Sequence, residues 1–485
     1  MSHPPLHVLE PGRNCWRIER ADRLALIVDA KRYFHAVKDA ILQARHSVYL
    51  IGWDFDTRIL FEPEHQTLEG PNKLGAFLRW FGKSHRDVNV YILKWDLGMI
   101  QALGRGMTPL VLLNWMTSKR IHFRLDGTHP RIAAHHQKIV VVDDRLAFCG
   151  GIDMTADRWD TREHKDDDPR RTRPSGRRYG PWHDASTAVD GAVAKALGDL
   201  ARARWKWASG EDLEPPPRCE PIWPSSIEPT FCDIDVAISR TIPKHEERDE
   251  VREIEALYLD AIASAKRSIY CESQYFASRR IAEAIAERLR EPNGPEVVII
   301  NPESADGFLE SVTMDTARYR LLKLLREADR HSRFRIYTPV AKKGTPIYVH
   351  AKITIVDDRL LRVGSSNFNN RSMGFDTECD LIVEASDGED DRTTRRTIID
   401  VRNDLLAEHL DVTPDVFGAA ADGGSLIRAV ESLRGAGRTL VPYEPEKPDA
   451  VSEALAENDL FDPEQPPSWS RKMLGWATRR PSPWR

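Results

Sequence analysis

Residues 135–151 read HHQKIVVVDDRLAFCGG, and residues 350–367 read HAKITIVDDRLLRVGSSN. Both stretches contain the pattern H-x-K-x-x-x-x-D, carried by His136, Lys138 and Asp143 in the first and by His350, Lys352 and Asp357 in the second. The residues between lysine and aspartate are mostly β-branched, so each stretch predicts a β-strand. A single H-x-K in a strand is common, and most such histidines are surface or core residues. Two copies in register, each followed by glycine, are not expected by chance.

The spacing within the pattern predicts how the side chains lie. Alternate residues of a strand share a face, so histidine and lysine two positions apart should share one pocket. The aspartate comes seven positions after the histidine, so we expect it on the opposite face, where it positions the strand.

If the two copies meet about a pseudo-twofold axis, two imidazoles and two ammonium groups surround one point. Such a set suits a phosphate, because the lysines offset the charge of its oxygens. One neutral imidazole can attack phosphorus while the other, protonated, gives its proton to the leaving oxygen. The lysines already supply positive charge and no carboxylate cluster accompanies the histidines, so the pattern predicts a reaction that needs no metal and no cofactor.

The rest of the chain repeats with a similar offset. Residues 34–54 and 255–274 each show helical periodicity followed by a short apolar run, which predicts a helix and then a strand in each copy. The two pattern histidines are 214 residues apart, and the matching serines, Ser47 and Ser268, are 221 apart. Further strand candidates follow in both copies: VNVYILKW at Val88, FRL at Phe123, EVVIIN at Glu296 and FRI at Phe334.

This alternation predicts an α/β fold of two similar βα sandwich lobes, each with a mainly parallel sheet. Pseudo-twofold symmetry would relate the lobes and place the active site at their interface. We expect a first lobe over residues 1–212, a proline-rich linker over 213–230 and a second lobe over 231–412. Residues 413–485 form a C-terminal tail that we expect to be partly loosely ordered, with one convincing helix at 426–434.

Composition limits the class of ligand and the location. The formal net charge of −5 disfavours a general attraction to nucleic acid, so we expect no nucleic-acid partner. The six cysteines form no C-x-x-C pair, which argues against a zinc module or a disulfide framework and favours a reducing compartment. Neither a signal peptide nor an apolar run of membrane-spanning length is present, so we expect a cytoplasmic protein.

Two basic segments suggest peripheral contact with a membrane surface. One is the arginine-rich loop at 170–178, for which a solvated loop balanced by neighbouring aspartates is the alternative. The other is a short amphipathic stripe at 469–480, for which packing onto the lobes is the alternative.

The two signatures resemble those of the phospholipase D superfamily, and the likeness covers about residues 17–410. Several segments are similar to its lipid-hydrolysing branch: GWDFD at Gly52, RWDT at Arg158 with His164, PWHD at Pro181, ESQYF at Glu272 and RNDLLAEHL at Arg402. The resemblance implies that His136 is the nucleophile and His350 the general acid, with Lys138 and Lys352 on the phosphate. The reversed assignment of the two histidines stays open.

The same resemblance implies further site residues. Gly151, Asp153, Ser365 and Asn367 lie at positions that should bind phosphate oxygens. Glu378 looks like the family's acidic residue that orients a catalytic imidazole, and Asp160 is a second candidate for that part, at His136.

The expected function is a phospholipase D-type phosphodiesterase that cleaves phospholipid headgroups through a covalent phosphohistidine to give phosphatidic acid. An alcohol in place of water would give transphosphatidylation. One alternative is a cardiolipin-synthase-like phosphatidyltransferase, against which the absence of N-terminal membrane helices counts. Another is a nucleic-acid phosphodiesterase of the same superfamily, which the acidic composition disfavours. A non-catalytic lipid-binding protein is the alternative outside enzymes, and the intact histidines and lysines argue against it.

Overall fold

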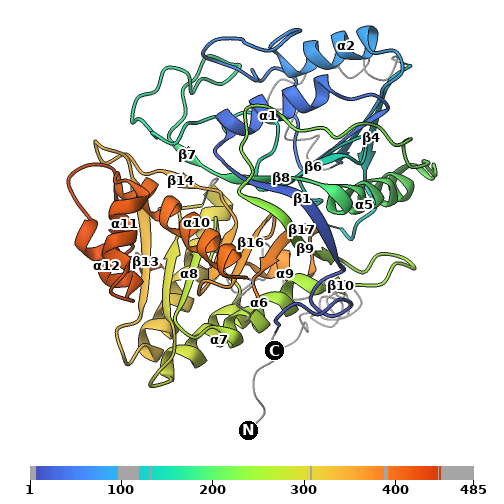
Figure 1. Ribbon diagram of the computed structural model, residues 1–485. Helices are drawn as coiled ribbons and strands as arrows, with labels where there is room; N and C mark the ends of the chain where they lie inside the picture. Colours follow the sequence, from blue (N-terminus) through green and yellow to red (C-terminus); the bar gives the residue numbers. More distant parts are fainter. Residues whose placement is uncertain are drawn as a thin grey trace, which may run out of the picture.

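The computed structural model describes residues 7–96, 119–131, 133–305, 308–386, 391–445 and 447–448. The first half of the chain, blue to green in Figure 1, contains eight strands and three helices among these residues. They are β1 (Arg17–Val28), α1 (Ala30–Leu42), β2 (Ser47–Gly52), α2 (Leu74–Ser84), β3 (Asn89–Trp95), β4 (Ile121–Asp126), β5 (Ile139–Val142), β6 (Leu146–Gly150), β7 (Trp182–His183), β8 (Ala185–Asp190) and α5 (Gly191–Ser209).

The second half, green to red in Figure 1, follows a similar plan and adds elements at its end. They are β9 (Phe231–Ile242), β10 (Val251–Arg252), α6 (Glu253–Ser264), β11 (Ser268–Glu272), α7 (Arg279–Arg290), β12 (Glu296–Ile300), α8 (Phe308–Ala328), β13 (Phe334–Val340), β14 (Tyr348–Val349), β15 (Ile353–Val356), β16 (Leu360–Gly364), α9 (Asn370–Gly374), β17 (Glu378–Glu384), α10 (Arg392–Leu410), α11 (Pro414–Ala421), α12 (Leu426–Leu433) and β18 (Thr439–Pro442).

The strands of both halves join in one large sheet. Its order is β18-β13-β12-β11-β15-β16-β17-β9-β1-β8-β6-β5-β2-β3-β4, with β10 attached to β9. Read outward from the antiparallel pair of β1 and β9, each strand of the first half in this sheet has a counterpart in the second half, which adds β18 at the edge and β10 beside β9. The helix-then-strand predictions are confirmed by α1 with β2 and by α6 with β11. The structure therefore confirms the α/β fold and gives both halves one strand order.

The prediction of a mainly parallel sheet is wrong. In the first half only β2, β3 and β4 pair in parallel, and in the second half only β11, β12 and β13 do. The remaining strands of the large sheet pair antiparallel because short turns connect several of them. Residues 143–145 join β5 to β6 and residues 357–359 join β15 to β16, and a turn this short can only return the chain beside itself.

Apolar packing joins the two halves. One cluster of buried side chains takes members from both, including Tyr49 and Ile139 from the first half and Tyr270 and Ile353 from the second. A second cluster lies in the first half, where α1 and α2 pack on the sheet, and a third lies in the second half with α6 and α7. The shared cluster makes the halves one packed body, which holds the loops between them in place.

The segment between the halves and the described residues after Asp411 both pack onto the lobes. Residues 211–230 contain neither helix nor strand, but Ile222 and Ile227 are buried in the first half's cluster. The expected helix at 426–434 is present as α12, and the structure adds α11 and β18, which pairs antiparallel with β13. The amphipathic stripe at 469–480 lies outside the described residues. Across the part of the chain that the structure describes, every helix is too short or too polar to span a bilayer.

Candidate active site

The two pattern histidines precede their strands instead of lying within them. His136 lies in an extended segment before β5, and its backbone N–H donates to the carbonyl of Thr377, next to β17 (3.0 Å). His350 lies between β14 and β15, and its N–H donates to the carbonyl of His183 in β7 (2.7 Å). Each histidine is thus anchored by the opposite half of the chain.

Each imidazole also takes its carboxylate from the opposite half. His136 Nδ1 lies 3.0 Å from both carboxylate oxygens of Glu378. His350 Nδ1 lies 2.7 Å from Asp184 Oδ2. A carboxylate at Nδ1 favours the tautomer in which Nδ1 carries the proton, and this leaves the lone pair of Nε2 available for chemistry.

The sequence predicted one of these carboxylates and missed the other. Glu378 contacts the imidazole of His136, one of the two pattern histidines. The assignment of Asp160 to His136 is wrong, because Asp160 accepts hydrogen bonds from His164 Nδ1 (3.0 Å) and the backbone N–H of Trp182 (2.8 Å). Asp184 could have been found by comparing the halves, because β8 and β17 hold equivalent places in the strand order. Asp184 directly precedes β8, and Glu378 is the first residue of β17. A longer loop before β7 hides the match in the sequence.

The two lysines lie beside the histidines. Lys138 Nζ donates to the carbonyl of His136 (2.7 Å) and forms an ion pair with Asp153 Oδ2 (3.2 Å). Lys352 Nζ donates to the carbonyl of His350 and lies 3.5 Å from Gln274 Oε1. Both lysine side chains are almost completely buried. In each half the ammonium group therefore lies close enough to the imidazole for its charge to lower the pKa of that histidine.

The residues expected to bind phosphate oxygens have other contacts. The ion pair with Lys138 explains Asp153 better than a phosphate contact does, because a carboxylate repels an anion. Ser365 Oγ donates to Glu378 Oε2 (2.5 Å). A Cβ atom at Gly151 would lie 2.3 Å from Asp184 Oδ1, so the glycine makes room for that carboxylate.

Asn367 is the fourth of these residues. Its backbone N–H donates to Ser372 Oγ (3.0 Å), and its side-chain oxygen is buried without a hydrogen-bond partner among the described residues.

The signature aspartates hold the backbone behind the site. Asp143 and Asp357 both sit at positive φ, 53° and 55°, in the turns after β5 and β15. Each accepts three backbone N–H bonds at the junction between a helix and a strand, from residues 45–47 and from residues 266–268. They point away from the imidazoles, as the odd spacing predicted, although they lie in turns and not in an unbroken strand.

Burial shifts the protonation of the whole group. Desolvation and the charges of the nearby lysines hold the pKa values of His136 and His350 well below their usual range. Burial also lowers the pKa of Lys352 to about 7 and raises that of Glu378 to about 8. These shifts share one main cause, because burial disfavours the charged form of each group, whether it is positive or negative.

Arg158 adds a further cation that the sequence did not single out as a site residue. Its guanidinium lies 4.3 Å from the centre of the Trp182 ring, which stacks on Tyr348 at 4.4 Å and lies 5.3 Å from the ring of His350. The charge of Arg158 contributes to lowering the pKa of His350. Arg158 Nε is buried without a hydrogen-bond partner among the described residues, so this side can take part in binding an anion.

Much of the charge of the basic loop at 170–178 is paired within the first half. Arg170 pairs with Asp168, Arg171 with Asp160, and Arg173 with Asp157. This arrangement agrees with the alternative of a loop balanced by neighbouring carboxylates.

Comparison with known proteins places this geometry in a family. Residues 258–393 match the family model described as "Cardiolipin synthase, PLD-like domain". The chain is 25% identical to "Phospholipase D A" of Dictyostelium discoideum over 83% of its own length and 37% of that protein's. It is 26% identical to "Cardiolipin synthase B" of Salmonella typhi over 79% of its own length and 80% of that protein's. The chain thus spans little more than a third of the Dictyostelium relative.

A solved structure shares the fold. The phosphatidylserine synthase of Haemophilus influenzae Rd KW20 superimposes with a TM-score of 0.54 at 14% identity, covering 91% of this chain and 94% of that one. The matching family model and the curated relatives support membership of the chain in the phospholipase D superfamily, and the shared fold agrees with it.

Proposed function

We propose that this chain is a phospholipase D-type phosphodiesterase that removes the headgroup of a phospholipid through a covalent phosphohistidine. The observation that carries the proposal is the pair of imidazoles, each oriented by a carboxylate from the opposite half and each beside a buried lysine. Two histidines with orienting carboxylates supply a nucleophile and an acid, and lysines supply charge for phosphate oxygens.

In the first step, Nε2 of His136 attacks phosphorus and the bond from phosphorus to the headgroup oxygen breaks. His350, in its imidazolium form, gives a proton to that oxygen, and the headgroup alcohol leaves. The negative phosphodiester itself favours this protonated form of His350, because it offsets the cations that lower the pKa of the free group. Lys138 and Lys352 face the phosphate oxygens throughout.

In the second step, water attacks phosphorus and His350 takes a proton from it. The bond between phosphorus and Nε2 of His136 breaks, phosphatidic acid leaves, and both imidazoles return to their first state. An alcohol that replaces water gives a new phosphatidyl ester. The side chain of His136 is 16% exposed and that of His350 is 5% exposed, so His136 is the imidazole that an incoming diester meets first.

A cardiolipin-synthase-like phosphatidyltransferase is the second candidate. It is favoured by the family model matched at residues 258–393 and by the coverage of 80% of the Salmonella relative. The first step would be the same, and phosphatidylglycerol would replace water in the second. A nucleic-acid phosphodiesterase remains the third candidate, disfavoured by the net charge of −5.

The test incubates the purified chain with phosphatidylcholine or phosphatidylglycerol vesicles and ethanol, and follows phosphatidic acid, phosphatidylethanol and cardiolipin. We expect phosphatidic acid and phosphatidylethanol from the wild type and neither from His136→Ala. His331→Ala, which alters an exposed histidine before β13, is the matched control and should keep full activity. Cardiolipin without phosphatidic acid would favour the transferase. No product from either lipid would refute the lipid assignment, and single-stranded DNA is then the next substrate.

A further inference from the structure

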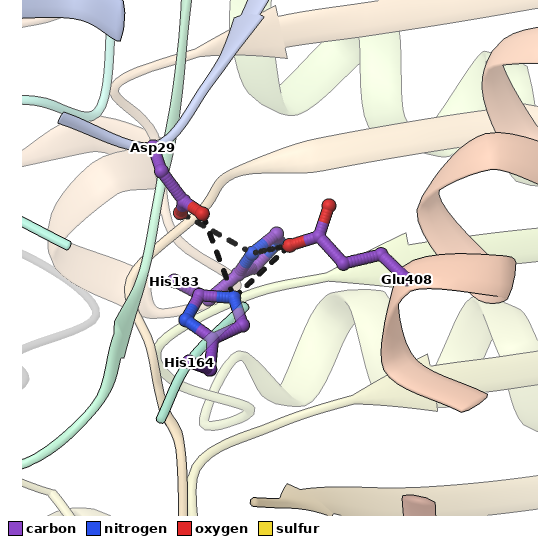
Figure 2. A group of neighbouring side chains, drawn as sticks. All are labelled: Asp29, His164, His183 and Glu408. Atoms are coloured by element: carbon purple, nitrogen blue, oxygen red, sulfur yellow. Dashed lines mark hydrogen bonds and ion pairs between the residues drawn. The ribbon is translucent and has the colours of Figure 1, made fainter. Parts of the chain in front are cut away.

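A second group of titratable side chains lies behind His350 and takes no part in the proposed reaction. Asp29 precedes α1, His164 lies in the loop after β6, His183 belongs to β7, and Glu408 comes from α10 of the second half. Figure 2 shows the four side chains pointing toward one another. All four are buried, with at most 2% of any side chain exposed. Such a group in the interior needs a charge balance that water cannot supply.

The donor atoms are spaced as ligands of one ion. Glu408 Oε1 lies 3.0 Å from His164 Nε2 and 3.2 Å from His183 Nδ1. The two oxygens of Asp29 lie 3.5 Å from the same two nitrogens. Tetrahedral zinc with ligands at about 2.0–2.1 Å separates neighbouring donor atoms by about 3.4 Å. The spacing of the four groups is close to that value.

Both imidazoles also carry the outer contacts that metal-bound histidines usually have. His164 Nδ1 lies 3.0 Å from Asp160 Oδ2, and His183 Nε2 lies 2.8 Å from Glu272 Oε2. A carboxylate at one ring nitrogen holds the proton there and leaves the other nitrogen as a lone pair. The nitrogens left in this way are the two that face Glu408.

The backbone conformation and two buried polar atoms without hydrogen bonds also indicate a ligand within this cluster. Asp29 and His164 sit at positive φ, 65° and 44°, which is costly for residues other than glycine and persists where surrounding contacts demand it. Asp29 Oδ2 and His183 Nδ1 are buried without a well-formed hydrogen bond among the described residues. Buried polar atoms of this kind usually have a partner, and a cation would supply one to both.

The charges of the cluster leave room for a divalent cation. Four buried carboxylates surround the two imidazoles: Asp29, Asp160, Glu272 and Glu408. Two guanidinium groups face them: Arg171 on Asp160, and Arg162 on Glu408 and on the more exposed Asp404. With neutral imidazoles, the remaining negative charge matches one divalent ion.

We propose that Asp29, His164, His183 and Glu408 bind one Zn²⁺ ion in a closed structural site. Two imidazoles and two carboxylates suit zinc, and four buried protein ligands leave no position for substrate. The ion joins α10 of the second half to three segments of the first. It also fixes His183, whose carbonyl accepts the N–H of His350 and whose neighbour Asp184 holds His350 Nδ1. The ion positions the proposed acid without entering the reaction.

The direct test is the metal content of the full chain, purified without a metal-affinity step and measured by mass spectrometry. We expect about one zinc per chain in the wild type and loss of at least nine-tenths of it in a double variant, His164→Gln with Glu408→Gln. His135→Gln is the matched control, because His135 is also buried against a carboxylate, Asp126, but lies outside the cluster. It should retain the zinc. Zinc that persists in the double variant would overturn the assignment.

A second measurement covers the case in which the double variant does not fold. Wild-type protein is unfolded, freed of metal with a chelator and refolded with either Zn²⁺ or chelator, and its melting temperature is measured. We expect a rise of several degrees with Zn²⁺, and tetrahedral absorption bands when Co²⁺ replaces it. A wild type that is purified without metal and refolds with the same melting temperature in both conditions would overturn the proposal. In that case protons on His164 and His183 balance the carboxylates. These readouts do not depend on activity toward any lipid.

Discussion

Glu378 and Asp184 contact the two imidazoles that we propose to be catalytic, and a neutral amide in place of either carboxylate would favour the wrong tautomer. In Glu378→Gln, the amide NH₂ can donate to Nδ1 of His136 and place the proton on Nε2, the attacking atom. We expect kcat to fall by about 10³–10⁴, as when the carboxylate of a catalytic triad becomes an amide, with little change in KM. Ser372→Ala, which removes one donor to Glu378 Oε1, should cost far less. A Glu378→Gln enzyme with wild-type kcat would contradict the proposed arrangement.

Two opposed pKa shifts predict the pH dependence of the free enzyme. Glu378 is ionised mainly above its pKa of about 8, and Lys352 is charged mainly below its pKa of about 7. Both groups must carry charge for orientation and for phosphate binding, and His350, whose pKa in the free enzyme is low, must be protonated. Below pH 7 the gain in ionised Glu378 and the loss of protonated His350 offset each other, so kcat/KM should change little there and fall as Lys352 loses its charge above pH 7. Initial rates at low substrate from pH 5 to 10 test this, and a maximum above pH 9 would contradict the shifts.

At this scale the sequence predicted which histidines and lysines gather in the candidate site, but not which carboxylate contacts each histidine. His136, Lys138, His350 and Lys352 were identified because their spacing is repeated. Glu378 lies 242 residues from the imidazole it contacts, and no local spacing encodes that distance. For the same reason the contact between Asp184 and His350 was missed and Asp160 was assigned to the wrong histidine. Which carboxylate contacts each imidazole is determined by how the two halves pack against each other.

Among the structural elements, the turn after β15 depends on one buried side chain. Asp357 accepts three backbone N–H bonds from residues 266–268 at the start of β11 and adopts a positive φ. In Asp357→Ala these donors lose their acceptor and the residue keeps a strained backbone. We expect a loss of about 2–3 kcal/mol, seen as a lower melting temperature.

The adjacent Asp358 provides the comparison for this variant. Its carboxylate pairs with Arg267 and Arg395 near the surface, so Asp358→Ala should cost less than about 1 kcal/mol. Equal melting temperatures for the two variants would show that the backbone contacts of Asp357 contribute little.

Helices and strands were predicted where the hydrophobic periodicity is strong, and missed where their formation depends on tertiary contacts. Helical spacing followed by an apolar run identified α1 with β2 and α6 with β11. The direction of the strands could not follow from periodicity, which is the same in parallel and antiparallel sheets. The short turns after β5 and β15 indicate antiparallel pairs, but the prediction did not take them into account. β18 has only four residues and forms because β13 offers a free edge. The segments similar to the lipid-hydrolysing branch at 158–164, 181–184, 272–276 and 402–410 had no visible relation in the sequence, yet three of them supply residues of the buried cluster.

At the scale of the whole molecule, the site exists only where the two halves meet. The backbone N–H of His136 is held by the second half and that of His350 by the first. An apolar cluster shared by both halves, and the central pairing of β1 with β9, fix this arrangement within one chain. Each chain therefore contains both imidazoles, both lysines and both orienting carboxylates of one site.

Because each chain contains a complete site, mixing two inactive variants should not restore activity. When His136→Ala and His350→Ala proteins are mixed in equal amounts, every site still lacks one imidazole, so phosphatidylethanol formation should stay at background. Wild type diluted with either variant should lose activity only in proportion to its dilution. Activity restored by mixing, toward a quarter or a half of the wild-type rate, would mean that histidines of different chains combine in one site. The contacts of His136 with Glu378 and of His350 with Asp184 would then form between subunits, with the halves exchanged.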